Sequence, residues 1–279
     1  MGGSFALAMK RAGLVRRVVG YSKSPSTTER ARQLGVIDVE APSALLAVSG
    51  ADLVLLAVPV AATESTLKAI RHLISPDVLI MDVGSTKRDV VDAARRVLKH
   101  DVGVFVPCHP ATGREVSGVE NADADLYTGR QVVLTPIERT RTVQLEQAET
   151  LWRALGCPVV RMSPETHDAA FAAISHLPHL LAFALMNAIT SQEQGSQFLS
   201  LAGPGFRDFS RIAASDSEMW RDILIANREE LSAQLGHFQR ELGVLQKVID
   251  GGQSEDLQRL IARASLTRAN WRLASGASD

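Results

Sequence analysis

Hydrophobic residues in the first 163 positions alternate between short continuous runs and longer periodic stretches. The continuous runs at residues 52–58 and 78–83 are typical of strands buried on both faces of a parallel sheet. In the periodic stretches the apolar residues return every three or four positions, which predicts amphipathic helices. Strands are predicted at residues 18–21, 52–58, 78–83, 104–106, 131–134 and 158–162, and helices at 5–12, 26–34, 61–73, 89–98 and 141–155.

This alternation predicts an α/β fold. Strands separated by helices are joined by right-handed crossovers, which build a mainly parallel, doubly wound sheet of the Rossmann type. From residue 164 the strand patterns stop and only helical patterns follow, with breaks at residues 203–205 and 251–252. We therefore predict one domain over residues 1–163 and an all-helical domain over residues 164–279.

The helix predicted over residues 166–191 is apolar almost all round, with Phe171, Leu181 and Met186 on different faces. Such a helix is expected to be buried. Because a domain of this size has little interior to cover it, we expect the helix to pack against a second copy of the chain. The helical domain is thus predicted to form a homodimer.

Two glycines, Gly2 and Gly3, lead directly into the first predicted helix. Dinucleotide-binding folds open with a strand, a glycine-rich turn, a helix and a second strand. Here only the last part of the turn is present, and no strand precedes it. Two glycines alone would also fit a flexible terminus, but the later alternation of strands and helices favours a dinucleotide-binding domain over residues 1–163.

The expected cofactor is NAD or NADP. NAD-selective sites place an acidic side chain after the second strand, whereas a 2′-phosphate favours hydroxyl and cationic groups. This chain has Ser22 and Lys23 there, and Arg30 one helical turn later. The pattern favours NADP, or use of both cofactors, although an exposed polar loop is the alternative interpretation. Gly2, Val58 and Pro59 are the other cofactor contacts that we expect, together with Ser85.

The composition of the chain argues against several classes of function. The net charge is −1, so no basic footprint for nucleic acid or an acidic membrane is present. The hydrophobic content of 46% and charged content of 22% are those of a soluble globular protein. Cys108 and Cys157 have no metal-binding spacing, and neither a membrane-spanning run nor a signal peptide is recognised. We expect a cytoplasmic protein without a bound metal.

A histidine, His109, follows the strand at residues 104–106 almost at once, after Pro107 has ended that strand. Ligands of α/β sheets bind at the carboxyl ends of the strands, and an imidazole there can act as a general base. A lone histidine in such a loop is more often structural, so a catalytic role for His109 has to be judged from the residues around it. Ser85 follows the strand at residues 78–83 and is expected to face the same cleft, although an N-cap would also explain this serine.

The helical domain carries further candidates. His167, His176 and His179 lie close together in the sequence, without the Cys or Glu ligands that would favour zinc. Arg211 follows the break at residues 203–205 and could clamp a carboxylate. Trp220 is equally compatible with a core and with a pocket.

Seven segments carry a resemblance to a known family: residues 1–4, 82–87, 109–115, 165–168, 175–179, 205–213 and 219–222. In this order, and over nearly the whole chain, they resemble the prephenate dehydrogenase family, which includes arogenate and cyclohexadienyl dehydrogenases. The resemblance implies an enzyme of tyrosine biosynthesis. Such enzymes pass a hydride from C4 of a cyclohexadienyl substrate to NAD(P), and the ring carboxylate leaves as CO2.

The resemblance also implies residue roles. His109 would accept the proton of the C4 hydroxyl, Ser85 would hydrogen-bond the same hydroxyl, and Arg211 would bind the ring carboxylate. The side-chain end of the substrate would meet His179 and Trp220. At the pocket mouth Glu115 would form an ion pair, His167 would support the site, and the helical domain would form the dimer.

The chain departs from the family at its start, where only the last glycine of Gly-x-Gly-x-x-Gly, matching Gly2, is present. Either the reading frame begins about 10–30 residues upstream, or part of the cofactor site is lacking. In the second case a non-catalytic dimeric binding protein becomes an alternative.

Another alternative is a β-hydroxyacid dehydrogenase, whose catalytic lysine usually lies on the long helix. Residues 164–205 contain no lysine, which argues against it. The sequence does not separate prephenate from arogenate. His179 favours prephenate, because a neutral imidazole can donate a hydrogen bond to the keto oxygen.

Overall fold

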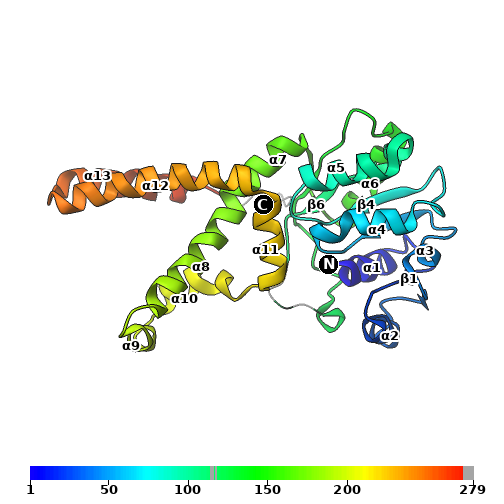
Figure 1. Ribbon diagram of the computed structural model, residues 1–279, viewed down its shortest axis with the longest axis horizontal. Coiled ribbons are helices and arrows are strands. Elements are labelled where there is room, and N and C mark those ends of the chain that lie inside the picture. The colour runs from blue at the N-terminus through cyan, green and yellow to red at the C-terminus, as the bar shows by residue number, and fades with distance from the viewer. Residues whose placement is uncertain (114–115, 117, 273–279) are drawn as a thin grey trace.

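The computed structural model describes residues 1–113, 116 and 118–272. An α/β part is joined to a helical part, from which a long hairpin of α12 and α13 projects (Figure 1). The strands and helices of the α/β part are α1 (Gly2–Arg11), β1 (Val19–Gly20), α2 (Pro25–Gln33), β2 (Val39–Glu40), α3 (Ala44–Ala47), β3 (Leu53–Leu56), α4 (Thr63–Ile70), β4 (Leu79–Asp82), α5 (Arg88–Leu98), β5 (Phe105–Val106), β6 (Cys108–Pro110), β7 (Val132–Leu134), α6 (Thr142–Ala154) and β8 (Val159–Arg161).

The strands form a mainly parallel arrangement, which confirms the predicted Rossmann-type fold. Strand β1 pairs with β2, and β3, β4 and β5 pair in that order, all in parallel. Strand β6 pairs antiparallel with β7, which pairs parallel with β8. Within the residues that the structure describes, no backbone ladder joins β1 and β2 to β3, so the sheet is interrupted at that place.

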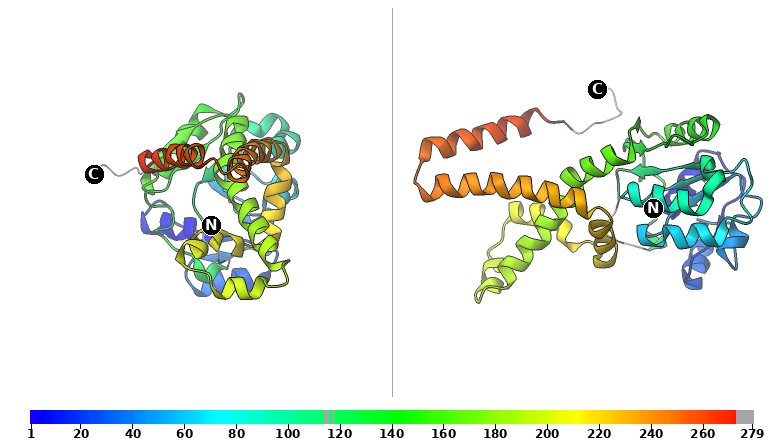
Figure 2. Two further views of the ribbon diagram at one scale, coloured as in Figure 1. Left: turned by 90° about the vertical axis from the view of Figure 1, so that its left-hand side faces the viewer. Right: turned by 45° about the horizontal axis from the view of Figure 1, so that its top comes forward.

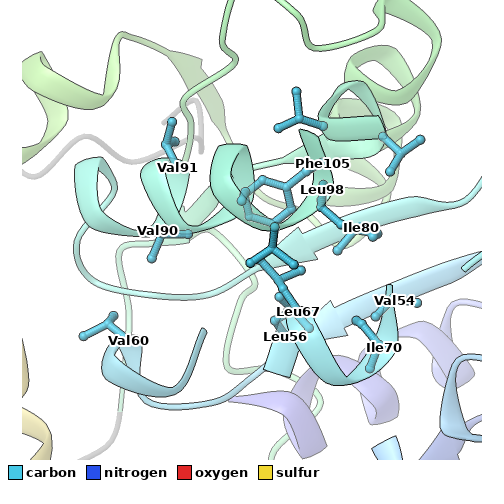
Figure 3. Packing of buried hydrophobic residues seen from close by; sticks show 14 of the residues in the cluster. Val54, Leu56, Val60, Leu67, Ile70, Ile80, Val90, Val91, Leu98 and Phe105 are labelled. Atoms are coloured by element: carbon cyan, nitrogen blue, oxygen red, sulfur yellow. The ribbon is translucent and has the colours of Figure 1, made fainter. Parts of the chain in front are cut away.

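Apolar side chains on one face of β3–β5 pack against α4 and α5. Leu56, Ile80 and Phe105 meet Leu67 of α4 and Val90 of α5 in this layer (Figure 3). The opposite face carries a second cluster, which includes residues of α1 and α6. Each fully buried aliphatic or aromatic side chain contributes roughly 1.5–3 kcal/mol to folding, so helices on both faces hold the strand ends in place.

Strand β3 differs from the prediction that residues 52–58 are buried on both faces. Val54 and Leu56 are buried, whereas Leu53 and Leu55 are only partly buried. By contrast, all four residues of β4 are buried. The reason is position: β4 lies between β3 and β5, whereas β3 is the outer strand of its ladder.

His109 lies within strand β6, not in a loop as the sequence suggested. Pro107 ends β5, and the chain then pairs with a different neighbour, His109 lying opposite Val133 of β7. Three residues that include a proline carry no periodic signal, so the sequence did not reveal this strand. The elements β2 and α3, of two and four residues, were missed because they are too short to show a period.

The helical part begins with one continuous helical run, α7 (Pro164–Phe171), the π-helical turn η4 (Ala172–His176) and α8 (Leu177–Thr190). The remaining helices are α9 (Gly195–Ser200), α10 (Pro204–Ser210), α11 (Ser217–Ala226), α12 (Arg228–Asp250) and α13 (Ser254–Asn270), and the α12–α13 hairpin extends away from the α/β part (Figure 2).

The predicted burial of the long helix is not achieved within one chain. In α8 only Leu177 and Ala182 are buried, and Ile174 in the preceding turn is 71% exposed. Contrary to the expectation of no membrane-spanning run, residues 164–190 are also long and apolar enough to cross a membrane by length and composition. An apolar helix face that needs a partner surface passes the same test.

Candidate active site

Three buried side chains form a line of hydrogen bonds at the junction of the two parts. The Nδ1 atom of His109, on β6, lies 2.7 Å from Nε2 of His167, on α7. The Nδ1 atom of His167 in turn lies 2.7 Å from Oδ1 of Asp168. His109 is 7% exposed, and the other two residues are almost fully buried. The line therefore runs from a buried carboxylate to an imidazole at the edge of the sheet.

The Asp168 carboxylate caps helix α5. Its Oδ1 accepts the backbone N–H of Lys87 at 2.8 Å, and its Oδ2 accepts that of Arg88 at 2.9 Å. Burial opposes ionisation, but the hydrogen bonds from His167 and from the two amides outweigh it and lower the pKa of Asp168. A helix N-terminus also favours a negative charge. Asp168 is thus an anion that can only accept hydrogen bonds.

The two histidines are neutral at neutral pH. Burial, aided by the nearby His167 and Lys87, lowers the pKa of His109 well below its ordinary value. Burial also lowers the pKa of His167, although Asp168 acts in the opposite direction. A neutral imidazole has one bare ring nitrogen, which is what a general base requires.

A buried ion pair fixes the strand that carries His109. The Nζ atom of Lys87 lies 2.5 Å from Oδ2 of Asp82 and donates to the backbone oxygen of Cys108 at 2.8 Å. Oδ1 of Asp82 accepts the N–H of Cys108 at 2.9 Å. These contacts tie β6 to the end of β4. Sequence reasoning singled out neither charge, although a lone aspartate ending a buried apolar run was an available signal.

Phe171 forms an apolar wall beside the histidine pair. Its ring centroid lies 4.4 Å from those of both His109 and His167, and it stacks on His167 at 18°. The contact restricts rotation of both imidazoles and helps to exclude water from them.

Behind this line, Asn227 connects Asp168 to a third histidine. Its Nδ2 donates to the backbone oxygen of Asp168 at 2.8 Å and to Nδ1 of His176 at 3.1 Å. His176 is fully buried, and its Nε2 has no hydrogen-bond partner within the described residues. Asn227 was not predicted, because an asparagine between two helices gives no sequence signal of such a contact.

His179 and Trp220 form a stacked pair on α8 and α11. Their ring centroids are 3.5 Å apart at an angle of 21°. Nδ1 of His179 lies 2.9 Å from the backbone oxygen of Ser175, so Nδ1 carries the proton. In the neutral ring Nε2 is therefore an acceptor, and the expectation that neutral His179 donates to a keto oxygen does not hold. Burial lowers the pKa of His179, which favours this neutral form.

Comparisons with known proteins identify the family. The model of the prephenate dehydrogenase nucleotide-binding domain matches residues 5–161, and that of the prephenate dehydrogenase dimerization domain matches residues 163–263. The chain belongs to the prephenate dehydrogenase family.

Individual relatives agree with this assignment. A prephenate dehydrogenase of Bacillus subtilis is 36% identical over 266 residues, which cover 95% of this chain and 71% of that protein. A cyclohexadienyl dehydrogenase of Zymomonas mobilis is 34% identical, over 82% of this chain and 78% of its own length. The crystal structure of the A. aeolicus prephenate dehydrogenase with hydroxyphenyl propionate and NAD+ is similar at a TM-score of 0.89 and 33% identity, covering 96% of this chain and 93% of that one.

The other predicted substrate contacts of this prephenate dehydrogenase family member come from both parts of the chain. Ser85 is half-buried in the turn between β4 and α5. Arg211 is exposed and begins the turn η5 (Arg211–Ala214), which packs against α8. Glu115 lies outside the described residues. The structure brings His109 and His167 into contact, and it joins His179 to Trp220, while the roles of all these residues stay predictions.

The predicted cofactor contacts lie at the start of α1 and the end of β3. A Cβ atom on Gly2 would lie only 2.8 Å from Cβ of Ala57, so α1 can approach β3 this closely only with glycine at that position. Val58 and Pro59 follow Ala57 directly. The first hydrogen bond within α1 runs from the N–H of Phe5 to the oxygen of Met1. The amides before it point off the helix end, an arrangement that suits a phosphate.

The loop proposed for the cofactor's ribose contains Ser22, whose Oγ accepts the N–H of Ser24 at 3.2 Å, and the exposed Lys23. The Nε atom of Arg30 lies 3.6 Å from Glu120, a weak exposed ion pair. Within the described part of the chain, no group of His, Cys, Asp or Glu is arranged to hold a metal ion.

Proposed function

We propose that this chain catalyses the oxidative decarboxylation of prephenate, arogenate or both, to 4-hydroxyphenylpyruvate or tyrosine, with hydride transfer to NAD(P). The observation that carries the proposal is His109, a buried and neutral imidazole at a sheet edge, held through Nδ1 by His167. The family supports the same chemistry. A β-hydroxyacid dehydrogenase is not favoured, because both family models and the near relatives indicate prephenate dehydrogenases.

In this proposal His109 acts as the general base. Its Nε2 accepts the proton of the C4 hydroxyl while the hydrogen on C4 departs as hydride, so that C4 becomes a carbonyl carbon. As CO2 leaves, the electron pair of the bond to the ring carboxylate passes through the ring to the C4 oxygen, which takes up a proton and becomes the phenol. When bound, the nicotinamide supplies the hydride acceptor.

The remaining side chains position the substrate. Ser85 hydrogen-bonds the C4 hydroxyl and orients the nicotinamide, and Arg211 binds the ring carboxylate. The stacked pair of His179 and Trp220 lines the side-chain end of the substrate.

Several residues fit the cofactor. The free amides at the start of α1, next to Gly2, suit the pyrophosphate, with Val58 and Pro59 alongside. Ser22 and Lys23, with Arg30 once its weak pair with Glu120 opens, offer the hydroxyl and cationic groups that a 2′-phosphate favours. We therefore propose that NADP is used in addition to, or in preference to, NAD.

We further propose that the enzyme is a cytoplasmic homodimer whose domains meet at residues 163 and 164. The family model over residues 163–263 describes a dimerization domain. The half-exposed apolar surface of α8 supplies a surface for a second copy. Neither nucleic acid nor a membrane is a proposed partner.

The decisive experiment is an assay of all four combinations of prephenate or arogenate with NAD or NADP, followed through the absorbance of the reduced nicotinamide. We expect turnover with at least one substrate and higher kcat/KM with NADP than with NAD, or similar values. Absence of turnover in all four combinations, by a folded protein, would support a non-catalytic dimeric binding protein instead. A strong preference for NAD would contradict the assignment of Ser22, Lys23 and Arg30.

A further inference from the structure

We propose that Asp168 is a positioning residue that determines, through His167, which ring nitrogen of His109 carries the proton. The inference rests on the proposed role of His109 as the base. Asp168 itself lies two hydrogen bonds away from the reacting atoms. Its effect follows from counting donors and acceptors along the line.

Asp168 acts only as a hydrogen-bond acceptor. Both carboxylate oxygens accept backbone N–H groups at the start of α5, from Lys87 at 2.8 Å and from Arg88 at 2.9 Å. An ionised carboxylate has no proton to give. The 2.7 Å contact with His167 is therefore a hydrogen bond in which Nδ1 of His167 donates to Oδ1 of Asp168.

The position of the proton on His167 also determines its position on His109. A neutral imidazole carries one proton, so with Nδ1 of His167 protonated its Nε2 must be an acceptor. Nε2 of His167 lies 2.7 Å from Nδ1 of His109 and accepts the N–H of that nitrogen. The single proton of His109 is then on Nδ1. Its Nε2 keeps a lone pair, which is the arrangement that a proton acceptor needs.

The other pair of tautomers is unfavourable at a single contact, that of His167 with Asp168. If both rings were in the other tautomer, the bare Nδ1 of His167 would face Oδ1 of Asp168 across 2.7 Å. Two acceptors would then meet in a site where His167 is fully buried, which is costly. The carboxylate therefore fixes the tautomers of both rings.

Asn227 makes this arrangement rigid. It donates to the backbone oxygen of Asp168 and to His176, so it holds α7 and η4 against the start of α12. When His109 takes up a proton, the positive charge is one hydrogen-bonded imidazole away from the Asp168 anion. That anion stabilises the charged base as it forms.

The test is Asp168→Ala in the full chain, read by ¹⁵N NMR of the histidine rings. Alanine has no acceptor for Nδ1 of His167, so nothing then favours one pair of tautomers over the other. The wild-type spectrum should show His109 protonated at Nδ1, and the variant should show a mixture of the Nδ1 and Nε2 tautomers. We expect kcat to fall about 10²–10⁴-fold, because the base loses both its single tautomer and the anion that stabilises its charged form, with KM for the cofactor changed less than about twofold.

Asp89→Ala is the matched control. Asp89 lies in the first turn of α5, the helix that Asp168 caps, and the same removal of a carboxylate there leaves the line from Asp168 to His109 intact. We expect the wild-type tautomer and kcat within about twofold of wild type.

The outcomes separate this inference from the proposed function. A wild-type His109 protonated at Nε2 would overturn the inference, and this spectrum is decisive even where Asp168→Ala does not fold. A single Nδ1 tautomer in folded Asp168→Ala, or a mixture of tautomers with unchanged kcat, would overturn it as well. If the variant shows the mixture but the wild-type chain turns over no substrate, the proposed function fails while the positioning role of Asp168 stands.

Discussion

The contact between Nδ1 of His109 and Nε2 of His167, at 2.7 Å, joins the two parts of the molecule at the proposed reacting group. His109 comes from β6 of the α/β part, and His167 comes from α7, the first helix of the helical part. The base is therefore supported by a residue 58 positions away in sequence. Movement of one part against the other would disturb this hydrogen bond.

Replacement of His109 by asparagine or alanine should abolish turnover while leaving cofactor affinity nearly unchanged. Loss of a general base costs about 10²–10⁴-fold in rate. Initial rates and calorimetric titration with NAD and NADP measure the two effects. The exposed His100 provides the control, since His100→Asn should behave as wild type. Loss of cofactor binding in the His109 variants would show that the assigned role is wrong.

Gly2→Ala should weaken cofactor binding and destabilise the fold by about 1–3 kcal/mol, because the added Cβ overpacks the contact with Ala57. The double variant Gly2→Ala/Ala57→Gly removes the opposing methyl group and should restore most of both properties. Denaturant unfolding and cofactor titration measure them. Equal losses in the single and double variants would mean that this contact is not the cause.

Lys87→Met should destabilise the protein by about 3–5 kcal/mol, since it leaves the Asp82 carboxylate buried without its partner. The variant Lys87→Met/Asp82→Asn removes both charges and should recover part of the loss. Urea unfolding of the three proteins gives the comparison. A single variant as stable as wild type would show that the ion pair does not hold β6 to β4.

Stability should fall as the pH is lowered, and His176 should account for part of the loss. Burial lowers the pKa of His176 from 6.5 to about 4. Above pH 6.5 the ring is neutral in both the folded and the unfolded chain. Between pH 6.5 and 4 the His176 ring becomes protonated in the unfolded chain but stays neutral in the folded chain. Lowering the pH through this range therefore removes up to about 3 kcal/mol of stability.

Urea unfolding at a series of pH values measures this loss. His176→Gln has no group that titrates in this range and should show a shallower acid dependence, whatever its absolute stability. His109 and His167, whose pKa values burial also lowers, act in the same direction and leave a residual slope. An identical pH dependence in the variant would exclude His176 as a cause.

Substrate preference should change with pH through His179. In its neutral form Nε2 accepts a hydrogen bond, which suits the ammonium group of arogenate, whereas the protonated ring donates to the keto oxygen of prephenate. The ratio of kcat/KM for prephenate to that for arogenate should therefore decrease as the pH rises through the lowered pKa of His179. His179→Gln, which can donate and accept at any pH, should give a constant ratio. A pH-independent ratio in the wild type would contradict this role.

Much of the fold was determined by the sequence itself. Continuous apolar runs specify the buried strand β4 and periodic stretches specify α5 and α6, because local burial demands act within each segment. The change to purely helical patterns after residue 163 predicted the helical part, and motifs spread along the chain identified the family. His109 stood out because it lies two residues after the proline that ends a buried run.

Only the tertiary structure determined how these pieces act together. Strand β6 forms because the N–H of Cys108 donates a hydrogen bond to Asp82 and because His109 pairs with Val133. These are contacts between distant segments, which no local sequence pattern encodes. The same holds for the proton positions: Asp168 fixes the tautomer of His167, and the Ser175 carbonyl fixes that of His179. Residue types supply donors and acceptors, but which donor meets which acceptor depends on distances that only the folded chain sets.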